Sequence, residues 1–223
     1  MLGLAIALAL VSLSVPGRHI AAIDPPPAAG FGRALLAPAV LTFLACAFLS
    51  KISTAPLNVF FTLYAMENGH SQLIAGWLWA LGVVVEVIIL VMMSQYLAKF
   101  DPRQLMLLAL AVAMLRWPMI AWGIESLWLM LIAASLHGIT FGVFHVGAME
   151  FLRQSFPRQQ LGRGIAMYST LGFGAANMLG SPISGILYEQ GGGQLAFSVA
   201  TVVACAGFLL MFWQMNQSQH RMA

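Results

Sequence analysis

The 223 residues are 61% apolar and only 8% charged, and their mean hydropathy is +0.88. A soluble domain carries roughly 25% charged residues to cover its surface, so this composition excludes a water-soluble globular fold. The net charge of +3 does not indicate a nucleic-acid partner, because the basic residues lie between apolar segments, where they orient a membrane protein.

Apolar blocks of about twenty residues, the length that crosses a hydrocarbon core roughly 30 Å thick, predict membrane helices. The first block covers residues 1–15. Residues 16–36 contain four prolines and three glycines, so we expect no helix there and predict a cytoplasmic linker. The other helices are expected at 37–64, 71–98, 105–123, 127–152, 164–188 and 195–214. Because the connections are short, neighbouring helices should be antiparallel. We expect an all-α membrane protein with a six-helix bundle over 37–214 and a cytoplasmic tail at 215–223.

The first apolar segment does not resemble a signal peptide. Its first basic residue, Arg18, follows the apolar run, and no basic leader precedes that run. A chain that begins inside a span is typical of a truncated protein or of a reading frame that starts late. We therefore interpret residues 1–15 as part of a membrane helix.

The basic residues of the predicted loops all fall on one side of the bundle. They are Arg18, Arg33, Lys99, Arg103, Arg153, Arg158, Arg163 and Arg221. The opposite loops carry Glu67, Glu125 and Glu189 and no lysine or arginine. This distribution predicts that the basic loops and the C-terminus are cytoplasmic in a bacterial inner membrane.

Small residues recur at four-residue spacing in two of the expected helices. Gly138 and Gly142 form one such pair, and Gly172, Ala176 and Gly180 continue the pattern in the next helix. This spacing lets helix backbones approach closely in lipid. It fits a tight bundle, and also helices that rock between two states.

Five ionisable side chains lie at membrane depth: Lys51, Glu86, Arg116, His137 and His145. A charge at the bilayer centre costs about 2.5–3.5 kcal/mol, so these groups need partners or a wet cavity. Lys51 and Glu86 lie roughly 20 Å from the outer ends of their helices at 1.5 Å per residue. His137 lies about 17 Å and Arg116 about 12 Å from theirs. Secondary transporters place their substrate and ion sites in this layer of the membrane.

Each of these groups has a chemical interpretation and a structural one. Glu86 and His137 are candidate proton carriers, or else form a static ion pair and a local hydrogen bond. Arg116 can hold a carboxylate with two parallel hydrogen bonds or control the charge on Glu86. Lys51 can bind an anion or neutralise Glu86, and His145 is a further candidate for substrate binding or a charge pair. Thr140 and Asn58 are further candidates for hydrogen bonds in a cavity.

The two intramembrane histidines do not suggest a metal site. His145 follows His137 by eight residues, about 12 Å along a helix, which is too far for one ion to bind both. We therefore expect no metal and no cofactor. An intramembrane enzyme built on these histidines is the least favoured hypothesis, because no nucleophile accompanies them, and we do not expect an enzyme.

The order of an acid, an arginine and a histidine on successive helices resembles the C-terminal half of the lactose permease branch of the major facilitator superfamily. Three segments resemble the 3-phenylpropionate transporters more closely: Tyr64–Val87, which ends its Leu-Trp-Ala-Leu-Gly-Val-Val-Val run at Glu86; Leu115-Arg116-Trp117; and Leu136–His145. The resemblance covers residues 37 to about 214. It implies that the six helices correspond to the family's seventh to twelfth helices, and residues 1–15 to the end of its sixth.

The resemblance implies half of a proton-coupled symporter of a small metabolite, with an aromatic carboxylate such as 3-phenylpropionate as the candidate substrate. Protons, the lipid bilayer and an N-terminal half, supplied from outside this sequence or by a separate chain, would be its partners. Thr140 stands where the lactose permease pattern has an acid, which leaves Glu86 as the main carboxylate candidate. The alternative hypothesis is an inactive transporter fragment with only a structural role.

Overall fold

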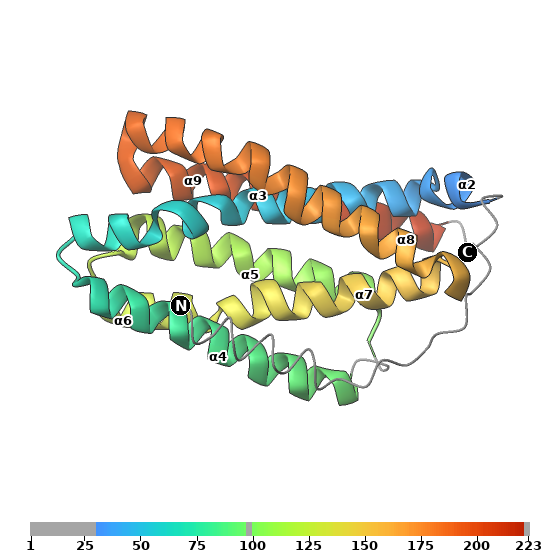
Figure 1. Cartoon of the computed structure of the whole chain (residues 1–223), viewed down its shortest axis with the longest axis horizontal. Helices are drawn as coiled ribbons and strands as arrows, with labels where there is room; N and C mark the ends of the chain where they lie inside the picture. The colour runs from blue at the N-terminus through green and yellow to red at the C-terminus, as the bar shows by residue number, and fades with distance from the viewer. Residues whose placement is uncertain (1–29, 97–99, 221–223) are drawn as a thin grey trace, which may run out of the picture.

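The structure, a computed structural model, describes residues 30–96 and 100–220, and the regular elements of these ranges are all helical (Figure 1). The expected helix at residues 1–15 lies outside the described residues. The elements, in chain order, are α2 (Phe31–Leu35), α3 (Pro38–Glu67), α4 (Gln72–Tyr96), α5 (Pro102–Gly123), α6 (Leu127–Ser135), η2 (Gly138–Val143), α7 (Phe144–Ser155), α8 (Arg158–Tyr168), η3 (Ser169–Ala175) and α9 (Ala176–His220). The two η elements are π-helical segments, each continuous with the α-helices on both sides.

Five stretches of the described residues are long and apolar enough to cross a membrane, and the last of them, Arg158–Gln217, has 60 residues. A straight helix of that length would measure about 90 Å, three times the thickness of a hydrocarbon core. The backbone is non-helical at Gly191 and Gly192, and the chain reverses direction there (Figure 1). This stretch therefore crosses twice, which gives six crossing helices in the described ranges. The all-α membrane fold expected from the sequence is confirmed.

Local sequence determines where several helices begin. Pro38 and Pro102 stand in the first turns of α3 and α5, where the missing backbone N–H would have no helical partner. The carboxylate of Asp101 caps α5 by accepting a hydrogen bond of 2.9 Å from the backbone nitrogen of Arg103. Between α3 and α4, Gly69 has a φ of +87°, which only glycine adopts readily in a tight turn.

One expectation about the linker is wrong. Residues 16–36 were predicted to hold no helix, but Phe31–Leu35 form the short helix α2. The prolines of the linker all precede this segment, and Gly30, with a φ of +100°, starts it. The ring of Phe31 packs against Phe156 with 5.5 Å between ring centroids, so a tertiary contact supports a helix that its own sequence does not favour.

Helix α9 packs along both α3 and α5, whereas α4 lies at the edge of the bundle against α6 and η2 (Figure 1). The close approaches expected from the small residues are present. A Cβ atom added to Gly180 would lie 2.7 Å from the Cβ of Ala55 on α3, and one added to Gly138 would lie 2.9 Å from the backbone of Val85 on α4. These glycines therefore place helix backbones against each other, as lipid-embedded packing requires.

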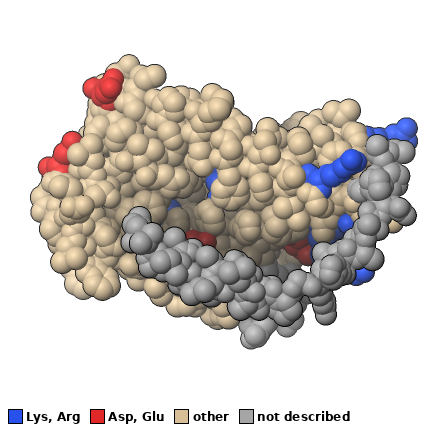
Figure 2. Space-filling view, viewed as in Figure 1, with Lys and Arg blue, Asp and Glu red and all other residues tan. Residues whose placement is uncertain are grey.

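The basic residues of the connections lie at one end of the long axis, where Asp101 and Glu150 also lie, and the connections at the other end carry Glu67, Glu125 and Glu189. In Figure 2 the red acidic atoms at the left end and the blue basic atoms at the right end mark its two ends. The left end carries the α3–α4 connection and the reversal in α9, and the right end carries the start of α8 (Figure 1). The figure also shows charged atoms in a recess midway along the molecule.

Candidate functional site

A contact between α4 and the helix formed by α6 and η2 lies at the centre of the site. The Nε2 atom of His137 is 3.4 Å from carboxylate oxygen Oε2 of Glu86, and both side chains are largely buried. The other ring nitrogen of His137, Nδ1, is buried and has no hydrogen-bond partner among the described residues. The imidazole therefore faces the carboxyl with one nitrogen and keeps the other unoccupied. This arrangement suits a group that takes up and releases a proton.

Arg116 on α5 is only 3% exposed and supports the helix that carries His137. Its Nε atom donates a hydrogen bond of 2.8 Å to the carbonyl oxygen of Ala133, and its Nη1 atom donates one of 3.1 Å to the hydroxyl of Thr140. The Thr140 hydroxyl donates in turn to the carbonyl oxygen of His137, at 3.1 Å. Within residues 30–96 and 100–220, no carboxylate lies within 4.0 Å of Arg116. In this conformation the guanidinium group of Arg116 therefore donates to a backbone carbonyl oxygen and to a hydroxyl oxygen.

Lys51 is buried halfway along α3 and contacts two aromatic rings. Its Nζ atom lies 3.6 Å from the ring centroid of Phe141 in η2 and 4.4 Å from that of Phe173 in η3. Each such cation–π contact contributes about 0.5–2 kcal/mol, so the rings offset part of the cost of placing the charge at this depth. The ion pair with Glu86 that was considered from the sequence is not formed within 4.0 Å.

The two histidines are connected through an aromatic ring. Phe141 stacks on His137 with 5.7 Å between ring centroids and on His145 with 6.2 Å. The Nδ1 atom of His145 lies 3.4 Å from the hydroxyl of Tyr168 in α8. Asn58, by contrast, is exposed on α3, two turns after Lys51 on the same face.

The two π-helical segments set the positions of these groups. Segment η2 begins directly after His137 and contains Thr140 and Phe141, and η3 contains Phe173. A π-helical turn holds more residues than an α-helical turn and therefore rotates the side chains that follow it. Such segments are rare and occur frequently at functional sites.

Sequence reasoning brought forward seven residues for the site and overlooked three aromatic ones. Phe141 could have been found, because it lies four residues from each histidine and so shares their helix face. Phe173 and Tyr168 carry no comparable signal, because their role depends on how η3 and α8 pack against α3 and α7.

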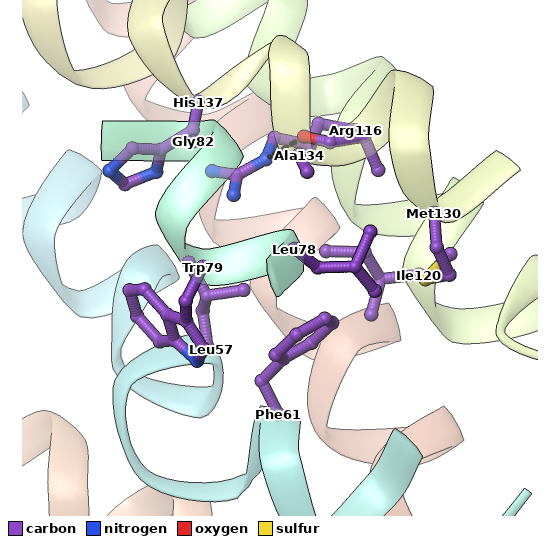
Figure 3. Close-up of a pocket in the computed structure, with 11 residues that line it drawn as sticks. Leu57, Phe61, Leu78, Trp79, Gly82, Arg116, Ile120, Met130, Ala134 and His137 are labelled. Carbon is purple, nitrogen blue, oxygen red and sulfur yellow. Dashed lines mark hydrogen bonds between the residues drawn. The ribbon is translucent and has the colours of Figure 1, made fainter. Parts of the chain in front are cut away.

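A small cavity inside the bundle has Arg116 and His137 at one end (Figure 3). Its other lining residues are apolar: Leu57, Phe61, Leu78, Trp79, Gly82, Ile120, Met130, Ala133 and Ala134. The cavity volume is about 20 Å³, which is room for a single water molecule. An organic substrate does not fit in this cavity.

Comparisons with known proteins place the chain among transporters. A family model described as the MFS_1 like family matches residues 5–199. A protein of Escherichia coli (strain K12) named "Probable 3-phenylpropionic acid transporter" is 30% identical over 167 residues, which are 75% of this chain and 44% of that protein. "Uncharacterized transporter YwbF" of Bacillus subtilis (strain 168) is 21% identical over 192 residues, which are 86% of this chain and 48% of that protein. The chain spans about half the length of these curated relatives.

Proposed function

This chain belongs to the MFS_1 like family, within the major facilitator superfamily of membrane transporters, and we propose that it forms one half of a proton-coupled symporter. We assign its six crossing helices to the family's seventh to twelfth helices, as the sequence resemblance implies. The second wall of the transport cavity would come from an N-terminal half outside this sequence or on a separate chain. The aligned residues make up 44% and 48% of the two relatives, which is about the share of one half.

We place the protein in a bacterial inner membrane with the start of α8 and the C-terminus in the cytoplasm. The argument is the position of the basic residues, since Arg153, Arg158 and Arg163 lie at one end of the bundle and the connections at the other end carry Glu125 and Glu189. Basic loops remain on the cytoplasmic side during insertion.

The observation that carries proton coupling is the 3.4 Å contact between Glu86 and His137 at membrane depth. An isolated charge at membrane depth is costly. An anionic substrate adds a second negative charge near the carboxylate of Glu86, so substrate binding and protonation of Glu86 favour each other. Glu86 takes up the proton, and His137 exchanges it. Arg116 acts as a positioning residue, because it reaches His137 only through Thr140 and the backbone of its helix.

The proposed substrate is a small aromatic carboxylate. One relative is named as a transporter of 3-phenylpropionic acid, and the site of this chain combines cationic and aromatic side chains.

The test is uptake of labelled 3-phenylpropionate into proteoliposomes under an imposed pH gradient. The chain is reconstituted alone and together with the first half of the Escherichia coli relative. In at least one of these two preparations, wild type should accumulate substrate, and a protonophore should abolish this accumulation. Glu86→Gln should abolish accumulation but keep exchange of substrate across the membrane, because only the proton site is removed. Glu125→Gln, an exposed carboxylate outside the site, is the control and should behave as wild type.

Two results would contradict the proposal in different ways. Unchanged pH-dependent accumulation in Glu86→Gln would remove Glu86 from the coupling mechanism. Absence of transport in both preparations would favour the alternative, an inactive fragment with a structural role.

A further inference from the structure

We propose that Lys51, held between Phe141 and Phe173, is the anchor for the carboxylate of the substrate, and that the two rings contact the apolar body of that substrate. This inference rests on the proposed function, because it assumes that the substrate is an anion that enters the bundle. To the proposed function it adds the side chain that binds the substrate and the chemical class of the anion that fits beside that side chain.

The first argument is the state of the Lys51 ammonium group. The Lys51 residue is 7% exposed, and its ammonium group forms neither a hydrogen bond nor an ion pair with the described residues. An ammonium group has three N–H donors, and ring faces attract its charge without accepting these donors as an oxygen does. A carboxylate would supply both the opposite charge and the acceptors.

The second argument is that the surroundings of Lys51 are held in place. Phe141 is stacked between His137 and His145, and Phe173 meets Phe141 edge-on with 6.2 Å between ring centroids. Both rings come from π-helical segments, which are otherwise unfavourable. A site whose walls are already ordered loses little entropy when it binds a ligand.

The third argument is access. The face of α3 that carries Lys51 continues through Thr54, which is half-buried, to Asn58, which is exposed. A ligand on this face could therefore reach the ammonium group from outside the bundle. Asn58 lies about 10 Å further along the helix and could contact the far end of a small substrate.

The other cations of the membrane layer are less suited to this task. Arg116 is more deeply buried and already donates to Ala133 and Thr140. His137 faces Glu86, and His145 faces Tyr168.

The surroundings also select the type of anion. A single ammonium group between aromatic rings matches a monocarboxylate with a flat or apolar body. A phosphate would bring a second charge and further oxygens that would face only rings.

The experiment measures binding of two labelled probes, 3-phenylpropionate and its uncharged analogue 3-phenylpropionamide, to the full chain in lipid nanodiscs. The chain is measured alone and with the first half of the Escherichia coli relative. Lys51→Gln should weaken binding of the acid about tenfold or more, the loss expected for one charge-assisted hydrogen bond, and should leave amide binding unchanged. Lys51→Arg should keep most of the affinity for the acid. Phe173→Leu should weaken both probes, because it removes a ring and keeps the charge.

Arg158→Gln is the matched control, because it removes an exposed positive charge outside the site. It should bind both probes as wild type does. Equal affinity of wild type and Lys51→Gln for the acid would overturn the anchor and leave the proposed function standing. An equal loss of acid and amide in Lys51→Gln would also overturn it, since the effect would then be structural. Wild type that binds neither probe would instead overturn the proposed substrate class.

Discussion

Replacement of Gly138 by alanine tests whether the contact between Glu86 and His137 depends on the close approach of η2 to α4. A Cβ atom at position 138 would lie 2.9 Å from the carbonyl carbon of Val85 and 2.9 Å from the Cδ1 atom of Ile89. Backbone cannot move aside as a flexible side chain can. Helix α4 must therefore shift by roughly 0.5 Å or more to restore ordinary carbon–carbon contact. Val85 precedes Glu86, and Gly138 follows His137, so this shift lengthens their contact.

Gly142, in the same π-helical segment, provides the matched control. A Cβ atom there would meet Ile89 at 3.4 Å and Glu86 at 3.6 Å, which is ordinary contact. Both replacements gain about 1 kcal/mol because alanine favours a helix more than glycine does. That gain cancels in the difference between the two variants. The difference isolates the steric cost, which we expect to make Gly138→Ala about 1–3 kcal/mol less stable than Gly142→Ala.

The assay is reversible unfolding in mixed micelles, followed by circular dichroism as the fraction of dodecyl sulfate rises. Gly142→Ala should unfold at or above the wild-type midpoint, and Gly138→Ala clearly below Gly142→Ala. In the proteoliposome assay, Gly138→Ala should also reduce accumulation driven by a pH gradient more than Gly142→Ala does. Equal stability of the two variants would refute the reasoning, because the approach of η2 to α4 would then not be tight.

Two further predictions concern buried hydrogen bonds, and the same unfolding assay checks both. Arg116→Lys should lower stability by about 1–2 kcal/mol, because the single side-chain nitrogen of lysine cannot occupy the positions of both Nε and Nη1, which donate to separate acceptors. Wild-type stability would show that these bonds contribute nothing. Tyr64→Phe should cost about 1 kcal/mol or more, because it leaves a buried carbonyl oxygen unpaired, whereas Tyr188→Phe, whose hydroxyl donates to exposed Glu67, should cost less. The reverse order would contradict the burial argument.

The helices were the most predictable feature of this protein. Composition alone excluded a soluble fold, and apolar blocks located the crossing helices because a chain in lipid must satisfy its backbone hydrogen bonds within each helix. The structure differs at the ends. Helix α8 begins at Arg158, six residues before the predicted start at 164, and α2 forms inside the predicted linker. These ends lie outside the apolar blocks, where tertiary contacts and capping determine at which residue a helix begins and hydropathy carries little information.

The pairing of side chains within the candidate site was not predictable from the sequence. The rise per residue placed Lys51, Glu86, Arg116 and His137 in one layer, and the structure gives Glu86 and His137 a direct contact. The sequence offered Arg116 and Lys51 as partners of Glu86. In the structure, Arg116 instead contacts Thr140 and a backbone oxygen, and Lys51 contacts two rings.

Hydropathy and helical rise were enough to predict a helical membrane protein and the order of the polar groups along each helix, because both depend only on positions within one helix. The tertiary structure decided which groups meet. That choice depends on the rotation of each helix about its own axis against its neighbours, and the π-helical segments η2 and η3 change this rotation partway along two helices. The contact of Glu86 with His137, and the rings around Lys51, follow from that rotation.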